Sequence, residues 1–389
     1  MKLLYIAPYP PNLTRVRTLH LVRELAQICE LQLYVMSVRG ERPDVSAVQA
    51  DLTEAIPAWK MGVNGLRGYS RGLPLQAAMT SAHELATALS RGSWDWIHAE
   101  HLRSGSALLG GEHAFSWDAV DAVSALLDSA AAAAGGLRGA LLRREAKRTR
   151  QYEKSMLSAA TLTFAAGEFD AGLLRAIQPG ASVRVVANGV DLQRFAFSGS
   201  RRPSTVVFSG KMSFHANVHA ARILLKEVMP MVWLRRPSVD VVVAGANPPR
   251  SLQKFGTDER VRFTGYVEDI GAVISNAAVA FCCIPYGQGI QNKVLEAMAV
   301  GTPVVANAVA TRSLQVVGGE HLLVADSPQA AADAILEIMD DRELNRRISA
   351  QARTYVEDNH TWAAAARRMA SQIDLLAQTG TVPRSVGRQ

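Results

Sequence analysis

Cysteine is scarce in this sequence, and no run of apolar residues is long. Only three cysteines occur among 389 residues, and their spacing fits neither a disulfide framework nor a zinc site. The longest apolar runs, such as Val279–Ile284, fall far short of the roughly 20 residues that span a membrane. The N-terminus lacks the long apolar core and cleavage site of a signal peptide. We therefore expect a cytoplasmic protein, with the inner face of the membrane as the alternative location.

Neither sign of charge is strongly in excess. The sequence holds 42 Lys and Arg against 35 Asp and Glu, spread over both halves. Dispersed charge with few aromatic clusters excludes a nucleic-acid-binding domain. Residues 138–150 are the exception, with Glu145 as the one acid among six cations: Arg138, Arg143, Arg144, Lys147, Arg148 and Arg150. A helix over this stretch presents a solvated basic face, or it contacts an anionic acceptor or a membrane surface.

The length indicates two domains, because one ordinary hydrophobic core does not extend over 389 residues. Strand patterns alternate with helix patterns, which is typical of parallel sheets with right-handed crossovers. We predict a first Rossmann-like domain over 1–187, a hinge and linker over 188–204, a second Rossmann-like domain over 205–360, a helix over 361–378 that packs back on the first domain, and a polar tail over 379–389.

The first half begins as a strand, a loop, a helix and a second strand. Lys2–Ala7 and Glu30–Ser37 have the composition of buried strands. Pro8–Asn12 follows the first strand in place of the Gly-x-Gly-x-x-Gly motif, so NAD or FAD is not expected here. Arg15 and Arg17 stand at the start of the helix. Their guanidinium groups reach a phosphate or carboxylate of a ligand, or one of them has only a surface role.

The remainder of the first half has weaker patterns. We expect a helix over Leu75–Ser90, a low-complexity break over Ala130–Gly136, and short strands over Thr161–Ala166 and Val183–Ala187. Together with the earlier elements they complete an open sheet of about six strands. No internal repeat is present at solenoid periods.

Polar side chains gather at two positions in this half. His98, Glu100 and His101 stand at the end of a buried strand, and Asp118 and Asp121 add carboxylates further on. The ligand crevice of an α/β sheet lies beyond the carboxyl ends of its strands. These groups therefore suit acid–base or hydroxyl-binding work. The alternatives are imidazoles that bond only the backbone and acidic residues that begin a helix.

Glycine loops end four successive strands in the second half, at Gly210, Gly245, Gly265 and Gly289. After the strand Val279–Ile284, the pattern becomes helical from about Gln291. A helix that starts on a glycine loop offers free N–H groups to a phosphate. Lys211 adds a compact cation, and Glu296 inside the helix accepts hydrogen bonds from sugar hydroxyls. The first strand of this half is expected over Thr205–Ser209, and a helix is expected after Asn217. Another helix is expected to begin at Ser327-Pro328, which has N-cap and N1 chemistry.

Taken together, these residues resemble a nucleotide-sugar glycosyltransferase of the GT-B fold, in glycosyltransferase family 4. The matching pieces cover most of residues 188–326: Asn188-Gly189-Val190-Asp191, Gly210-Lys211, Gly245, Gly265-Tyr266-Val267, Gly289 through Glu296, and Gly301-Thr302-Pro303-Val304-Val305. The first half matches more loosely. The Gly-Ile-Gln-Asn-Lys-Val-Leu-Glu-Ala-Met-Ala form is similar to a bacterial subgroup that serves polysaccharide or glycosylated-metabolite biosynthesis.

The resemblance implies an α/β protein with two Rossmann-like open parallel-sheet domains that face each other across a cleft. It implies retaining transfer of a sugar from a nucleotide-diphosphate sugar to a hydroxyl of a polysaccharide, lipid or secondary metabolite. No metal and no cofactor are expected, and the protein is expected to be a monomer or a homodimer. The partners would be the nucleotide sugar and its acceptor, with no nucleic acid.

The resemblance also assigns residues to the site. The donor-binding set is Gly210, Lys211, Gln288, Gly289, Ile290, Gln291, Asn292, Lys293 and Glu296. Lys211 and the amides near Gly289 would hold the diphosphate, and Glu296 would bind the ribose. The catalytic set is His98, Glu100 and Lys211, and the acceptor-side set is Arg15, Arg17, His101, Asp118 and Asp121.

Two departures from the family pattern stand out. Gln288 replaces the first of two glutamates, the one that usually touches the donor sugar. Leu13-Thr14 replaces a glycine pair in the first loop, which indicates a different fit on the acceptor side. The alternatives to a transferase are a non-catalytic nucleotide-sugar binding protein and a GT-B sugar-nucleotide epimerase.

Overall fold

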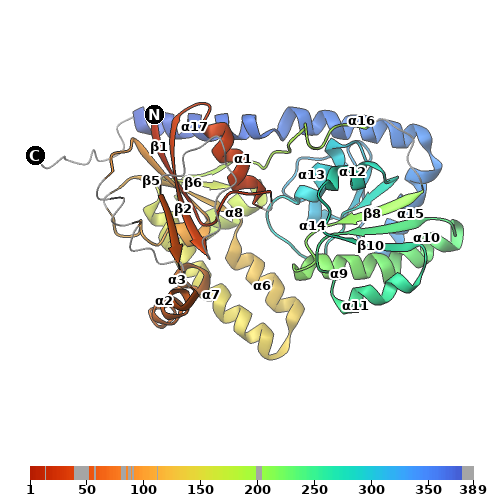
Figure 1. Cartoon of the computed structure of the whole chain (residues 1–389), viewed down its shortest axis with the longest axis horizontal. Coiled ribbons are helices and arrows are strands. Elements are labelled where there is room, and N and C mark those ends of the chain that lie inside the picture. Colours follow the sequence, from red (N-terminus) through yellow and green to blue (C-terminus); the bar gives the residue numbers. More distant parts are fainter. Residues whose placement is uncertain are drawn as a thin grey trace, which may run out of the picture. The chain divides into compact units, whose positions relative to one another are not determined.

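The computed structural model describes residues 1–13, 15–38, 52–56, 58–79, 85, 89, 92–111, 113–198 and 204–378. The chain folds into two compact units. Unit 1 consists of Met1–Ala187 and Trp362–Gln389, and unit 2 consists of Asn188–Thr361. Each unit is an open parallel sheet covered by helices (Figure 1). The predicted tail, residues 379–389, and residues 199–203 of the linker lie outside the described residues.

Unit 1 contains a seven-stranded parallel sheet in the order β3-β2-β1-β4-β5-β6-β7. The strands are β1 Lys2–Ala7, β2 Glu30–Val38, β3 Leu52–Ile56, β4 Trp96–Glu100, β5 Phe115–Val120, β6 Leu162–Ala165 and β7 Val183–Val185. About six strands were expected, and β3 lies in a stretch with a weak apolar pattern. Because β1 is bonded to both β2 and β4, the topological switch point lies between β1 and β4. The carboxyl ends of these two strands therefore border the crevice of the sheet.

The core of unit 1 has two layers because successive strand residues point to opposite faces. Leu3 and Tyr5 of β1 pack in one layer with α1 and α17, and Leu4 and Ile6 pack in the other with α3 and α5–α8. The helices are α1 Val16–Leu25, α2 Ala58–Ser70, α3 Leu75–Met79, α5 His101–Ser104, α6 Val123–Ala134, α7 Gly136–Ala159, α8 Glu168–Ile177 and α17 Trp362–Gln378. The C-terminal helix thus contributes to the core of unit 1.

The predicted break over Ala130–Gly136 is wrong. Helix α6 continues through Ala134, because alanine is the strongest helix former. Gly135, with a φ of 61°, makes the turn into α7, which contains the whole basic stretch. Of the helix predicted over Leu75–Ser90, α3 ends at Met79, and most of the remainder lies outside the described residues.

Unit 2 contains a six-stranded parallel sheet in the order β10-β9-β8-β11-β12-β13. The strands are β8 Thr205–Ser209, β9 Asp240–Ala244, β10 Val261–Gly265, β11 Val279–Phe281, β12 Val304–Ala306 and β13 Leu323–Val324. β8 is bonded to β9 and β11, so the switch point lies between β8 and β11. The predicted strand through Ile284 is too long, since β11 ends at Phe281 before the chain turns into the glycine loop.

Eight α-helices are described around the sheet of unit 2: α9 His215–Ile223, α10 Met229–Arg235, α11 Arg250–Gln253, α12 Ile270–Ser275, α13 Asn292–Ala299, α14 Ala308–Thr311, α15 Pro328–Asp340 and α16 Arg342–Asn359. A π-helical turn, Leu224–Val228, joins α9 to α10. The helix start predicted at Ser327-Pro328 is confirmed, because Ser327 caps α15 by accepting from the amide of Ala330. Asn217 was expected before a helix but lies inside α9.

Candidate functional site

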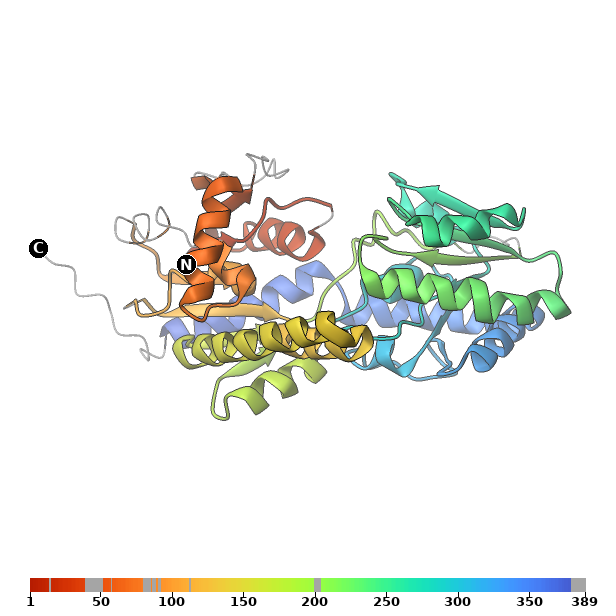
Figure 2. The same ribbon diagram turned by 90° about the horizontal axis from the view of Figure 1, so that it is seen from below.

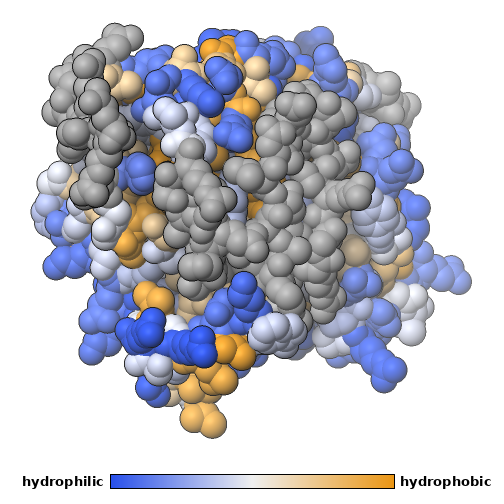
Figure 3. All heavy atoms as spheres, turned by 60° about the vertical axis from the view of Figure 1, so that its left-hand side comes forward, coloured by the Kyte–Doolittle hydropathy of each residue, from blue (hydrophilic) through white to orange (hydrophobic). Residues whose placement is uncertain are grey.

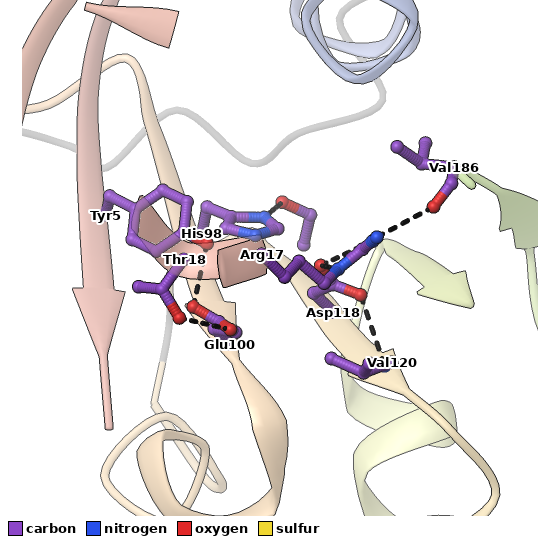
Figure 4. Close-up of polar contacts among 9 residues, drawn as sticks. Tyr5, Arg17, Thr18, His98, Glu100, Asp118, Val120 and Val186 are labelled. Atoms are coloured by element: carbon purple, nitrogen blue, oxygen red, sulfur yellow. Dashed lines mark hydrogen bonds and ion pairs between the residues drawn. The ribbon is translucent and has the colours of Figure 1, made fainter. Parts of the chain in front are cut away.

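The first cluster of polar groups lies at the switch point of unit 1, around Glu100 (Figure 4). The Glu100 carboxylate at the end of β4 accepts hydrogen bonds from Tyr5 Oη at 2.8 Å and Thr18 Oγ1 at 2.7 Å. Burial, and then the charge of Asp118, raise the pKa of Glu100 to about 7, against the opposing hydrogen bonds. A carboxyl group with this pKa exchanges its proton near neutral pH.

Arg17 and Asp118 form a buried ion pair beside Glu100. Arg17 donates from Nε to Asp118 Oδ2 at 2.8 Å and from Nη1 to the carbonyl of Val186 at 2.9 Å. Its Nη2 lies 2.8 Å from the same Asp118 Oδ2 in the ion pair. Asp118 Oδ1 accepts from the amide of Val120 at 3.1 Å. Figure 4 shows Arg17 reaching between Asp118 and Val186. These contacts direct the guanidinium inward, so Arg17 ties α1 to β5 and to the end of β7.

The two histidines differ in position. His98 is fully buried, with Nδ1 2.8 Å from Ser116 Oγ and its ring between Tyr5 and Phe164. Burial lowers the pKa of His98 to about 4, so the ring is neutral at ordinary pH. His101 begins α5 at the strand end and is half-buried. Burial, with the charges of nearby arginines, lowers the pKa of His101 to about 4 as well.

Backbone strain marks the same edge of unit 1. His101 has a φ of 63° and Val120 a φ of 64°, at the carboxyl ends of the paired strands β4 and β5. A β-branched residue such as Val120 rarely adopts this conformation, which costs of order 1–3 kcal/mol and tends to occur at functional sites. Next to Val120, burial and the charge of Asp170 raise the pKa of Asp121 to about 7. Neither of these two residues is a glycine, so the sequence gives no indication of their positive φ.

Unit 1 thus brings together most of the predicted acceptor-side and catalytic residues of the first half. Glu100, Asp118 and Arg17 are linked through the contacts and charges described above. Arg15 takes another direction, with its guanidinium carbon 3.9 Å from the centre of the Tyr9 ring. Within the described residues, no three His, Cys, Asp or Glu side chains are grouped so that they could hold a metal ion.

The second cluster lies at the switch point of unit 2, where two glycine loops touch. A Cβ at Gly245 would lie 1.9 Å from the carbonyl oxygen of Gly210, so the loops after β8 and β9 pack backbone against backbone. Lys211 is exposed beside them, and its carbonyl accepts from Asn217 Nδ2 at 3.0 Å. Asn217 Oδ1 accepts from Lys293 Nζ at 2.6 Å. Asn217 therefore connects the Lys211 loop to α13, a role that the sequence analysis missed.

The loop before α13 is fixed by contacts from distant residues. Gly289 has a φ of 67°, which favours glycine. Gln288 is buried, and its Oε1 accepts from Arg312 Nη2 at 2.8 Å; Arg312 also donates to the carbonyl of Gly287. Arg312, in the turn after α14, was not predicted as part of the site. Asn292 and Asn188 add a further contact, with Oδ1 and Nδ2 2.9 Å apart.

Two ionisable side chains on α13 differ in their partners. Lys293 is buried over the Phe208 ring and bonded to Asn217, and burial lowers its pKa to about 8. Burial raises the pKa of Glu296 to about 7, although the charges of Lys293 and Arg194 oppose the shift. Among the described residues, the Glu296 carboxylate has no hydrogen-bond partner. It is thus an acceptor near α13's start that is available for a ligand.

Comparisons with known proteins agree with this arrangement. Residues 203–341 match the family model described as glycosyl transferases group 1. A phosphatidyl-myo-inositol mannosyltransferase of Mycobacterium leprae is 26% identical over 207 residues, which cover 50% of this chain and 54% of that protein. A GDP-mannose:cellobiosyl-diphosphopolyprenol alpha-mannosyltransferase of Xanthomonas campestris is 25% identical over 183 residues, 44% of this chain and 47% of that protein. The chain spans about half the length of these curated relatives.

Solved structures match over nearly the whole chain. Sucrose-phosphate synthase from Thermosynechococcus elongatus has a TM-score of 0.74 at 16% identity and covers 98% of this chain and 100% of its own. Anabaena HepE in complex with UDP-glucose has a TM-score of 0.68 at 15% identity, covering 96% and 100%. The predicted GT-B fold with two Rossmann-like domains is confirmed. In sequence through residues 203–341 and in fold through both units, the chain resembles the GT-B nucleotide-sugar glycosyltransferases.

Proposed function

We propose that this protein transfers a sugar, with retention of configuration, from a nucleotide-diphosphate sugar to a hydroxyl-bearing acceptor. Unit 2 is the donor-binding unit, and no metal or cofactor takes part. The family match over residues 203–341 supports the reaction class. Two kinds of relative support a nucleotide-sugar donor: a mannosyltransferase named for GDP-mannose, and a protein of similar fold solved with UDP-glucose. The acceptor in this proposal is a polysaccharide, a lipid or a secondary metabolite.

Glu296 is the observation that carries this proposal. Its half-buried carboxylate has no hydrogen-bond partner within the described part of the chain, and its pKa is raised to about 7. Two ribose hydroxyls that donate to this group would supply the missing hydrogen bonds. They would also favour its charged form and lower its pKa. A half-buried carboxylate that keeps its acceptor capacity within reach of solvent is consistent with a ligand site.

The diphosphate has a separate set of donors. Lys211 is exposed at the switch point. Helix α13 begins shortly after Gly289, and the first backbone N–H groups of a helix have no acceptor within the helix and suit an anion. In the proposal, Lys211 and the amides near Gly289 and Ile290 hold the diphosphate and stabilise the charge that develops when the nucleotide leaves. Lys293 contributes indirectly, because its ammonium group is bonded to Asn217. Gln288, held by Arg312, contacts the sugar.

The acceptor side belongs to unit 1 in this proposal. Glu100 accepts the proton of the attacking hydroxyl, for which a pKa of about 7 is well suited. His101 and Asp121, at the ends of β4 and β5, hold further acceptor hydroxyls. His98 was predicted as catalytic, but its fully buried position between Tyr5 and Phe164 gives it a positioning role instead. Arg17 likewise supports Asp118 rather than the acceptor.

The proposal is tested with purified protein and a panel of nucleoside diphosphates and their sugars. The cognate nucleotide should raise the melting temperature, because a ligand of the native state stabilises it. Lys211→Ala should weaken nucleotide binding about tenfold or more, the loss expected for one charge-assisted contact. The matched control is Lys226→Ala, an exposed lysine of the same unit, which should bind as the wild type does. Equal binding by both variants would remove Lys211 from the donor site.

Turnover separates the proposal from its alternatives. Product formation with an unchanged anomeric configuration, read by NMR, supports the retaining transferase. A non-catalytic binding protein is the second candidate, because Gln288 stands where the family pattern has a glutamate. It predicts nucleotide binding without turnover for every acceptor tried. An epimerase would convert the donor into an isomer of equal mass without any acceptor.

A further inference from the structure

Helix α2 of unit 1 carries an apolar stripe that the fold leaves uncovered. Trp59, Val63 and Leu66 have exposed fractions of 73%, 38% and 77%. Their spacing of four and three places them on one face of the helix. The opposite face packs on α3, where a Cβ at Gly68 would collide with Ala78. Trp59 is the only exposed tryptophan of the six in the chain, since the other five are described as buried or half-buried.

The first turns of α7 continue this surface. Leu137 and Leu141 have exposed fractions of 80% and 59%. They share one helix face with Arg144 and Arg148, at spacings of four, three and four. Both arginines lie over the ring of Tyr69 in α2, with guanidinium carbons 5.7 and 3.6 Å from its centre, and Arg148 also donates to the Tyr69 carbonyl at 2.7 Å. The two apolar stripes are therefore joined through the arginines and Tyr69.

The charge around the stripes is basic. Residues 58–79 contain Lys60, Arg67 and Arg71 and no acidic residue, and residues 138–150 contain six basic residues and one acid. That acid, Glu145, accepts from the amide of Leu75 at 2.6 Å and is thereby engaged within unit 1. In the views of Figures 1 and 2, α2 and the α6–α7 hairpin lie on the same side of unit 1. At the bottom of the view in Figure 3, hydrophobic residues (orange) lie next to hydrophilic residues (blue) on the surface.

We infer that this surface, defined by Trp59, Val63, Leu66, Leu137 and Leu141 and called here the α2–α7 surface, docks on an anionic lipid bilayer. A helix with a tryptophan-containing apolar face and a basic rim is the form that lies in the plane of a membrane interface. Aromatic rings such as Trp59 settle at the level of the headgroups. The basic residues attract anionic lipids, and each contributes while it lies within a Debye length of the surface.

The charge pattern favours this occupant over a second copy of the chain. A self-complementary interface would bring two sets of the same cations together, because residue types repeat across a twofold axis. Anionic headgroups instead neutralise them. The described helices include none that could span a bilayer, so the contact proposed is peripheral. The inference goes beyond the proposed function, and it involves unit 1 residues outside the donor-binding set.

Vesicle binding tests the inference directly. The full chain is mixed with vesicles of pure phosphatidylcholine, or of phosphatidylcholine with 30 mol% phosphatidylglycerol, and both sedimentation and tryptophan emission are measured. We expect binding only to the anionic vesicles, about tenfold or more stronger, lost at high salt. A blue shift of the emission should accompany it, because Trp59 leaves water. Brominated lipids should quench the same signal.

Matched variants assign the contact to the surface. Trp59→Ser with Leu66→Ser, and separately Leu137→Ser with Leu141→Ser, should each lower vesicle affinity about tenfold. Arg67→Glu with Arg138→Glu should do the same at low salt only. Leu234→Ser is the control, since Leu234 is 84% exposed in unit 2 and lies outside the surface. The nucleotide-induced rise in melting temperature should stay unchanged in all of them.

Three results would overturn the inference. Wild-type vesicle binding by the Trp59→Ser, Leu66→Ser variant would show that α2 is not the contact. Equal binding to neutral and anionic vesicles would show that the basic residues do not select anionic lipids. A dimer in sedimentation equilibrium that Trp59→Ser dissociates, together with no vesicle binding by the wild type, would assign the surface to a second copy of the chain.

Discussion

The polar clusters of the two units lie at equivalent places, yet their side chains are engaged differently. Each lies at the switch point of a parallel sheet, between β1 and β4 in unit 1 and between β8 and β11 in unit 2. In unit 1, Glu100 accepts two hydrogen bonds and Arg17 is paired with Asp118. In unit 2, Lys211 is exposed and Glu296 has no hydrogen bond among the described residues. The Arg17–Asp118 pair of unit 1 is thus satisfied within the chain, whereas Lys211 and Glu296 of unit 2 can bind a ligand.

This difference shows why the same topology need not have the same role. A buried ion pair fixes the elements that carry it, because removing one partner leaves a charge without compensation. An unpaired carboxylate instead favours whatever ligand supplies its hydrogen bonds. We therefore expect mutations of the Arg17–Asp118 pair in unit 1 to act mainly on stability, and mutations of Lys211 and Glu296 in unit 2 to act mainly on ligand binding.

The largest effect is expected for Arg17→Met. The substitution leaves Asp118 buried without its counter-charge, and it should lower the free energy of unfolding by about 3–5 kcal/mol. Urea denaturation followed by circular dichroism measures this loss. Arg15→Met is the control two residues away, where an exposed cation over the Tyr9 ring should contribute only about 0.5–1 kcal/mol. Similar losses for the two variants would contradict the assigned role of the ion pair.

A smaller loss is expected for Gly245→Ala in unit 2. The new Cβ meets the carbonyl oxygen of Gly210, which is backbone and cannot rotate away. Overpacking of this kind costs about 1–3 kcal/mol, and the displaced Gly210-Lys211 loop should also weaken nucleotide binding. Gly172→Ala in α8 is the control, because nothing lies within 4 Å of its Cβ and alanine favours a helix. The comparison fails if Gly245→Ala leaves both unfolding and binding unchanged.

The smallest expected effect is a pH dependence of stability from Glu100. Its folded-state pKa is raised from 4.5 to about 7, so the native protein holds this proton to higher pH than the unfolded chain does. The stabilising contribution is present below pH 4.5 and is lost as the pH rises through 7. Unfolding free energies at pH 6.5 and pH 8 should differ by about 1 kcal/mol less in Glu100→Gln than in the wild type. Parallel pH profiles would contradict the shift.

The sequence predicted those parts whose causes are local. Strand β8 is an apolar run that ends at a glycine loop, and Ser327 caps α15, so both were found from neighbouring residues alone. The strained backbone of Val120 left no such signal, because the fold imposes it on a residue type that ordinarily avoids positive φ. Asn217 and Lys293 are 76 positions apart and meet only through the sheet order.

The same reasoning explains the errors in the site. His98 and Glu100 stand two positions apart on β4, so the sequence places both at the end of the same strand. The burial of His98, however, depends on Phe164 of β6, which lies two strands away in the sheet. Gln288 stood out as a departure from the family pattern, and its contact with Arg312 links two turns that the sequence does not connect. Long-range packing decides which polar groups are left for a ligand.

The central claim is that Glu296 binds the ribose of the donor. Its most direct test is a binding cycle by calorimetry, with the cognate nucleoside diphosphate and its 2′,3′-dideoxy analogue, on the wild type and on Glu296→Gln. The wild type should bind the analogue about tenfold or more weakly, since hydrogen bonds to a charged acceptor are worth about 1.5–3 kcal/mol. The variant should discriminate far less between the two. Equal discrimination by both proteins would contradict the claim.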